Sequence, residues 1–140
     1  MLGMLLADQG ADVIKVEPLR GDITRQMGVG HNGMTSGFLN MNRGKRGIAV
    51  DLKKKAGIEI VKRIAATADV FVQNFRPGTV ERMGIDEEAL RAIKPDLIYV
   101  SISGFGESGP YIKKRVYDPV IQALSGLTDV QRIGTPANHT

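Results

Sequence analysis

One stretch decides the fold class of this chain: residues 68–84 read ADVFVQNFRPGTVERMG. The apolar run from Val70 to Val72 has the composition of a buried strand, and it ends abruptly in a polar, aromatic and cationic loop. A short helical segment that carries Arg82 follows this loop. Open α/β sheets build their ligand sites in the loops that follow the carboxyl ends of their strands. Residues 68–84 therefore predict an α/β protein with a ligand site at one edge of its sheet.

Strands and helices alternate on both sides of this stretch. Predicted strands cover residues 13–16, 46–52, 68–72 and 97–103, and predicted helices cover residues 2–9, 56–66, 87–93 and 117–124. Apolar residues recur at helical spacing within residues 56–66, and Asp86 is a good N-cap for the helix that begins at Glu87. This alternation predicts an α/β fold with a mostly parallel sheet and flanking helices.

The composition narrows the class of protein. A chain of 140 residues, 42% of them hydrophobic, is long enough for one modest domain with a core. The absence of Cys excludes a disulfide framework, a thiolate metal site and a cysteine nucleophile. The longest apolar runs are too short to span a bilayer, and the first residues lack the basic start of a signal peptide. These features predict a cytoplasmic protein that does not bind membranes.

The net charge of +4 allows three interpretations. Nucleic-acid binding is one of them, but the spacing of the basic residues matches no known nucleic-acid module. A small excess of surface Lys and Arg is the more ordinary explanation. The third is an anionic small ligand that carries several phosphates, which would suit the basic clusters at residues 43–46, 53–55 and 113–115 if they converge on one cleft.

Several short motifs are better explained by structure than by chemistry. The glycine patterns at residues 28–33 and 104–109 are interpreted as turns. The first follows a polar stretch and not a strand, and no amphipathic helix opens after the second to receive a pyrophosphate. His31 has no partner at metal-ligand spacing, so we predict a solvated loop residue and no metal site. Glu17, at a strand end, leaves two interpretations open: an acid that binds a ribose hydroxyl, or a solvated acid.

The loop at residues 74–78 is the strongest candidate site. Phe75 lies in this loop and not in the strand, so its ring either covers a planar ligand group or packs back onto the core. The Asn74 side chain offers both a donor and an acceptor. From the residues alone these two interpretations of Phe75 are equally open.

Five separate segments, in order, resemble the class III coenzyme A transferase family, which includes formyl-CoA transferases, carnitine-type CoA transferases and α-methylacyl-CoA racemases. The matching segments are residues 10–17, 21–25, 42–53, 69–84 and 101–109, and the resemblance extends to the region of Tyr117. It implies the N-terminal part of a Rossmann-like large domain, from an enzyme whose ring-shaped subunits interlink as a homodimer. Residues 1–140 would then be a partial CoA-binding domain, with the first strand before residue 1 and the rest of the enzyme after residue 140.

The resemblance also implies which residues contact coenzyme A (CoA). They are Arg20, Val50, Lys53, Asn74, Phe75, Arg76, Arg82, Arg115 and Tyr117. In particular, we expect Lys53, Asn74, Phe75 and Arg82 to line one groove. CoA and acyl-CoA are expected as substrates, with no tightly bound cofactor.

The reaction implied is the transfer of CoA from an acyl-CoA donor to a carboxylic acid. An aspartate attacks the thioester to give a mixed anhydride, and CoA returns to form an aspartyl-CoA thioester. That aspartate would follow Thr140, and neither Asp118 nor Asp129 matches its position, so no catalytic residue is expected within the chain. The pair Tyr117-Asp118 stands where the racemase branch has His-Asp, which favours a transferase. An α-methylacyl-CoA racemase-type enzyme, a non-catalytic nucleotide-binding module and a silent CoA-binding remnant remain alternatives.

Overall fold

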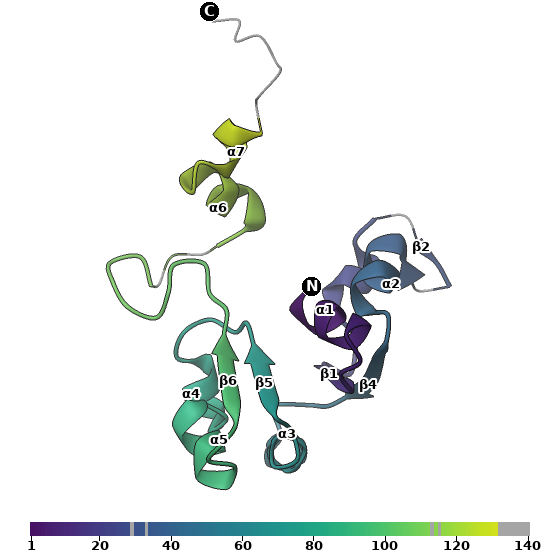
Figure 1. Cartoon of the computed structure of the whole chain (residues 1–140), viewed down its shortest axis with the longest axis vertical. Helices are drawn as coiled ribbons and strands as arrows, with labels where there is room; N and C mark the ends of the chain where they lie inside the picture. Colours follow the sequence, from purple (N-terminus) through teal and green to yellow (C-terminus); the bar gives the residue numbers. More distant parts are fainter. Residues whose placement is uncertain (29, 33, 113, 115, 132–140) are drawn as a thin grey trace, which may run out of the picture.

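The arrangement of strands and helices was obtained from a computed structural model, which describes residues 1–28, 30–32, 34–112, 114 and 116–131 (Figure 1). The strands are β1 (Val13–Glu17), β2 (Gly30–His31), β3 (Met34–Thr35), β4 (Lys45–Ala49), β5 (Val70–Gln73) and β6 (Ile98–Ser101). The helices are α1 (Leu2–Asp8), α2 (Ser36–Asn42), α3 (Lys55–Ala65), α4 (Thr79–Met83), α5 (Glu87–Ile93), α6 (Asp118–Leu124) and α7 (Leu127–Val130), with a 3₁₀ turn η1 (Ile23–Gln26).

Parallel strand pairs form the two main sheets. Strand β1 pairs with β4, from Val13 opposite Lys45 to Glu17 opposite Ala49. Strand β5 pairs with β6, from Val70 opposite Ile98 onward. The α/β fold class with parallel strands is therefore confirmed. Within the described residues, however, the two pairs are separate sheets and not one continuous sheet, and β2 and β3 form a small antiparallel hairpin.

The core lies where α3, α4 and α5 pack against the β5–β6 sheet, with α4 and α5 drawn beside β6 and α3 beside β5 in Figure 1. Its buried residues are Val61, Ala65, Val80, Ile85, Leu90 and Leu97. On the same sheet the rings of Phe71 and Tyr99 stack with centroids 5.4 Å apart. This packing fixes the carboxyl ends of β5 and β6, from which the loops of the candidate site emerge.

Most predicted elements are present, with shifted ends. The Asp86 N-cap is confirmed, because its Oδ1 accepts a hydrogen bond of 3.0 Å from the Ala89 N–H. The strand predicted over residues 46–52 ends at Ala49, because the chain turns at Asp51, whose carbonyl accepts from the Lys54 N–H. Residues 19–35, where the sequence predicted no strand or helix, contain η1 and the β2–β3 hairpin. Among the described residues, no helix is both long and apolar enough to cross a membrane.

Candidate functional site

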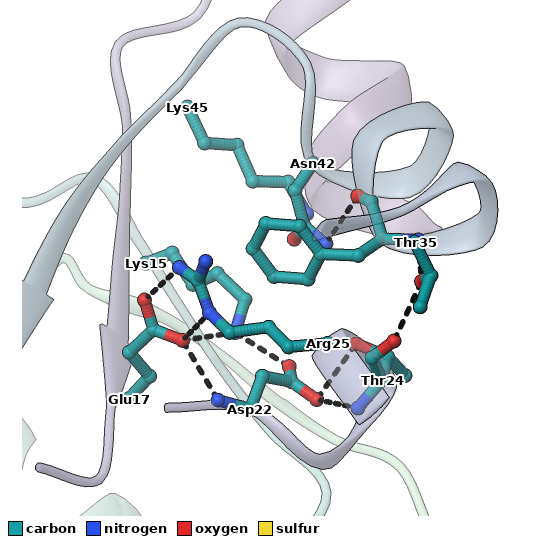
Figure 2. Close-up of polar contacts among 9 residues, drawn as sticks. Lys15, Glu17, Asp22, Thr24, Arg25, Thr35, Asn42 and Lys45 are labelled. Carbon is teal, nitrogen blue, oxygen red and sulfur yellow. Dashed lines mark hydrogen bonds and ion pairs between the residues drawn. The ribbon is translucent and has the colours of Figure 1, made fainter. Parts of the chain in front are cut away.

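A network of charged and polar side chains surrounds the carboxyl end of β1 (Figure 2). The Glu17 carboxylate accepts hydrogen bonds from Arg25 Nη2 (2.8 Å), Arg25 Nε (3.2 Å) and the Asp22 N–H (2.9 Å). The Arg25 guanidinium also lies over the Phe38 ring, 3.9 Å from its centroid. Glu17 is therefore not a solvated acid, because its side chain is only 10% exposed and accepts hydrogen bonds on both oxygens.

Asp22 anchors η1 to the same strand. Its Oδ2 accepts from Lys15 Nζ at 2.5 Å, and its Oδ1 accepts from the backbone N–H and the hydroxyl of Thr24. The buried Thr35 hydroxyl donates to the Thr24 carbonyl at 2.8 Å, which joins the hairpin to this turn. Residues 21–25, one of the segments that resemble the CoA transferase family, thus form a loop that hydrogen bonds connect to β1 and to the hairpin.

The electrostatics of this loop predict a loss of stability in acid. Burial alone would raise the pKa of Asp22, but the hydrogen bonds from Lys15 and Thr24 outweigh it and lower that pKa from 3.8 to about 2. The hydrogen bond from Arg25 likewise lowers the pKa of Glu17. A carboxyl group whose pKa is lower in the folded chain than in the unfolded chain stabilises the fold fully at a pH above its unfolded pKa. This contribution is lost as the pH falls from about 4 toward 2.

We therefore expect Asp22→Asn to cost on the order of 1 kcal/mol at pH 7, after solvent screening is allowed for. The difference from the unmodified chain should shrink between pH 4 and pH 2. Urea unfolding at a series of pH values measures this difference in the free energy of unfolding. Asp12→Asn is the matched control, because it removes an ion pair with Arg46 in which both side chains are 67% exposed. Equal pH dependence in the Asp22→Asn variant and the unmodified chain would contradict the prediction.

A cleft of about 900 Å³ opens at the carboxyl ends of β5 and β6, and we call it the β5–β6 cleft. Its walls are residues 74–78 after β5, residues 102–106 after β6, Ile112, Lys114 and Val116 from the segment before α6, and Asp118 and Ile121 of α6. The cleft thus lies at the sheet edge that the sequence predicted. It combines an aromatic and aliphatic lining with cationic side chains, which suits a ligand with apolar and anionic parts.

The loop after β5 carries the predicted aromatic side chain into this cleft. The Phe75 N–H donates to Gln73 Oε1 at 2.7 Å, and the ring is 38% exposed and lines the cleft. This position favours a ring that covers a ligand over a ring packed into the core. Gly78 then takes a left-handed conformation (φ 79°) that begins α4, a backbone geometry which suits glycine.

Gly104, which has no side chain, and the cationic residues Arg76 and Lys114 also line the cleft. Gly104 approaches Val116 so closely that an added Cβ would lie 2.4 Å from the Val116 side chain. Arg76 and Lys114 line the cleft, and Lys114 Nζ lies 3.6 Å from the centroid of the Tyr111 ring. Lys114 and the backbone at residues 102–106 were not among the predicted contacts, although the glycines after the strand and the basic run at residues 113–115 were visible in the sequence.

The structure gathers only some of the predicted CoA contacts. Asn74, Phe75 and Arg76 lie together in the β5–β6 cleft. Arg82, on α4, donates to Thr79 Oγ1, and a Cβ on Gly78 would lie 3.3 Å from Arg82 Nη1, so Arg82 lies beside the cleft without lining it.

The remaining predicted contacts lie elsewhere. Arg20 lines a second, smaller cavity with Pro18 and residues of η1. Val50 is buried, and its N–H donates to the Glu17 carbonyl, while Lys53 is exposed in the next turn. Tyr117 is 65% exposed just before α6. The prediction for Arg115 falls outside the described residues.

The fold and cleft together define an α/β protein with a candidate ligand site at the carboxyl ends of parallel strands. Residues 1–140 match the model of CoA-transferase family III, and the chain belongs to this family. A succinate–glutarate CoA-transferase from Agrobacterium fabrum is 44% identical over 136 residues, which is 91% of this chain and 34% of that protein. The human succinyl-CoA:glutarate CoA-transferase is 45% identical over 129 residues, which is 91% of this chain and 30% of that protein.

Solved structures agree with the family assignment. The crystal structure of a CAIB/BAIF family protein from Brucella suis superposes with a TM-score of 0.84 at 44% sequence identity. The match covers 91% of this chain and 35% of that chain. The chain therefore spans about a third of the length of the relatives that it matches.

Proposed function

We propose that this chain forms the CoA-binding part of a CoA transferase that moves CoA from an acyl-CoA donor to a carboxylic acid. The observation that carries the proposal is the β5–β6 cleft, with Asn74, Phe75 and Arg76 on one wall. Membership of CoA-transferase family III supports it. So do relatives named for succinate, succinyl-CoA and glutarate, because succinate and glutarate are carboxylic acids.

The chemistry of the cleft suits CoA. Phe75 offers a ring for a planar group, and Arg76 and Lys114 offer positive charge to phosphates. Arg20, Val50, Lys53, Arg82, Arg115 and Tyr117 remain proposed contacts, and the three arginines and the lysine among them would bind the same phosphates. The state of the Glu17 carboxylate counts against a dinucleotide site, because this side chain is only 10% exposed and already accepts three hydrogen bonds from the chain itself.

The proposed reaction passes through an aspartyl mixed anhydride and an aspartyl-CoA thioester. The nucleophile would lie in a segment that follows Thr140, and a further strand from a segment preceding Met1 would pair between β1 and β5. In Figure 1, β1 and β5 are the strands of the two parallel pairs that lie on the sides facing each other. The complete enzyme would be a cytoplasmic homodimer with interlinked subunits.

The 140-residue chain by itself should transfer no CoA. None of its aspartates is proposed as the nucleophile, so succinyl-CoA and glutarate should yield no glutaryl-CoA above the uncatalysed rate. Chromatography of the CoA esters after incubation measures this, with a longer family member that has CoA-transferase activity as the positive control. Turnover by the purified chain would show that the nucleophile lies within residues 1–140.

A further inference from the structure

We infer that Gln73 is a positioning residue that joins the two strand-end loops of the β5–β6 cleft. Gln73 is the last residue of β5 and is only 6% exposed. It does not line the cleft itself, so its effect on a ligand must pass through its neighbours. The inference rests on the proposed function only for the choice of CoA as the probe.

Both ends of the Gln73 amide form hydrogen bonds, one with the loop after β5 and the other with the last residue of β6. Its Oε1 accepts from the N–H of Phe75, in the loop after β5, at 2.7 Å. Its Nε2 donates to Ser101 Oγ at 2.8 Å, and Ser101 is its register partner at the end of β6. The Ser101 hydroxyl donates in turn to Glu107 Oε1, on the far side of the glycine-rich segment after β6. One buried side chain therefore connects both walls of the cleft.

The position of Phe75 depends on this connection. Its side chain is 38% exposed, so core packing does not hold the ring, whereas the backbone N–H has a defined acceptor in Gln73. This hydrogen bond is partly buried, so a Phe75 N–H that lost its acceptor would carry a free-energy cost, and the loop would relieve that cost by moving toward water. Such a movement would displace Asn74 and Phe75 together from the cleft wall.

Two substitutions separate positioning from simple stability. Gln73→Met keeps the length of the side chain but removes both hydrogen bonds. Gln73→Glu keeps an acceptor for the Phe75 N–H and offers the Ser101 hydroxyl a second acceptor. We expect the Met variant to bind CoA about tenfold more weakly and the Glu variant to stay within about threefold of the unmodified chain. Isothermal titration calorimetry with CoA measures the affinities of both variants.

Hydrogen exchange of the Phe75 amide supplies a second readout that needs no ligand. Its protection should fall in the Met variant and persist in the Glu variant. Val61→Ala is the stability control, because Val61 is buried in α3 and does not line the cleft, so its loss should destabilise the fold and leave CoA affinity unchanged.

Unchanged Phe75 protection in the Met variant would overturn the inference, as would unchanged CoA affinity in that variant. A loss of affinity in the Val61→Ala control as large as in the Met variant would also overturn it. If the unmodified chain bound no CoA, the proposed function would fail, and the exchange experiment would still test the role of Gln73.

Discussion

Gly57→Ala should destabilise the chain by about 2–4 kcal/mol, the largest effect that we expect from adding one methyl group. Gly57 is buried in the first turns of α3. An added Cβ would lie 2.2 Å from the Asp51 carbonyl oxygen and 3.0 Å from a Val50 side-chain carbon. The first contact is with backbone, so no side-chain rotation relieves it. Helix α3 would have to move away from the turn that follows β4.

Urea unfolding of the variant and the unmodified chain measures this cost, with Gly37→Ala as the matched control. Gly37 is also helical, in α2, but a Cβ added there meets nothing within 4 Å. Since Ala favours helix over Gly, the control should keep or slightly raise the stability. A Gly57→Ala variant as stable as the Gly37→Ala variant would show that α3 does not approach the Asp51 carbonyl as described.

Gly104→Ala should weaken CoA binding more than tenfold while leaving the core intact. A Cβ at residue 104 would lie 2.4, 2.5 and 2.8 Å from three atoms of the Val116 side chain. The short, branched valine has no flexible end that can swing aside, so the segment that carries it must shift. Because Gly104 and Val116 both line the β5–β6 cleft, that shift changes the shape of the ligand site.

The double variant Gly104→Ala with Val116→Ala makes this prediction specific. Removing the two Val116 methyl groups takes away the contacts of 2.4 and 2.5 Å and leaves the contact of 2.8 Å with the Val116 Cβ, so part of the CoA affinity should return. Calorimetric titration of the single and double variants measures the recovery, and Val116→Ala alone shows how much the valine itself contributes. Affinity in the Gly104→Ala variant equal to that of the unmodified chain would contradict the steric argument, and so would a double variant that recovers nothing.

The sequence predicted the elements that depend on local pattern. The apolar run from Val70 to Val72 predicted β5 and the loop after it. The helix predicted to begin after the N-cap Asp86 does begin there. Asn74, Phe75 and Arg76 reach one cleft because consecutive residues after a strand end cannot separate widely. The fold class followed from the alternation of elements, which is likewise a property of short windows.

Features that depend on contacts distant along the chain could not be predicted in the same way. The bonding of Glu17 to Arg25 requires η1 to fold back onto β1, and no local pattern announces that turn. The approach of Val116 to Gly104 joins segments twelve residues apart through an irregular loop. Lys53 and Arg20 follow strand ends as expected, but they follow β4 and β1, which form a separate sheet from β5 and β6, and this separation was not foreseen.

Backbone amide chemical shifts of the ¹⁵N-labelled chain, recorded while CoA is added, test most directly whether the β5–β6 cleft is the CoA site. We predict saturable shifts that concentrate at residues 74–78 and 102–106, and much weaker changes on addition of NAD. Shifts that concentrate elsewhere on the chain, or tighter binding of NAD than of CoA, would contradict the proposed site.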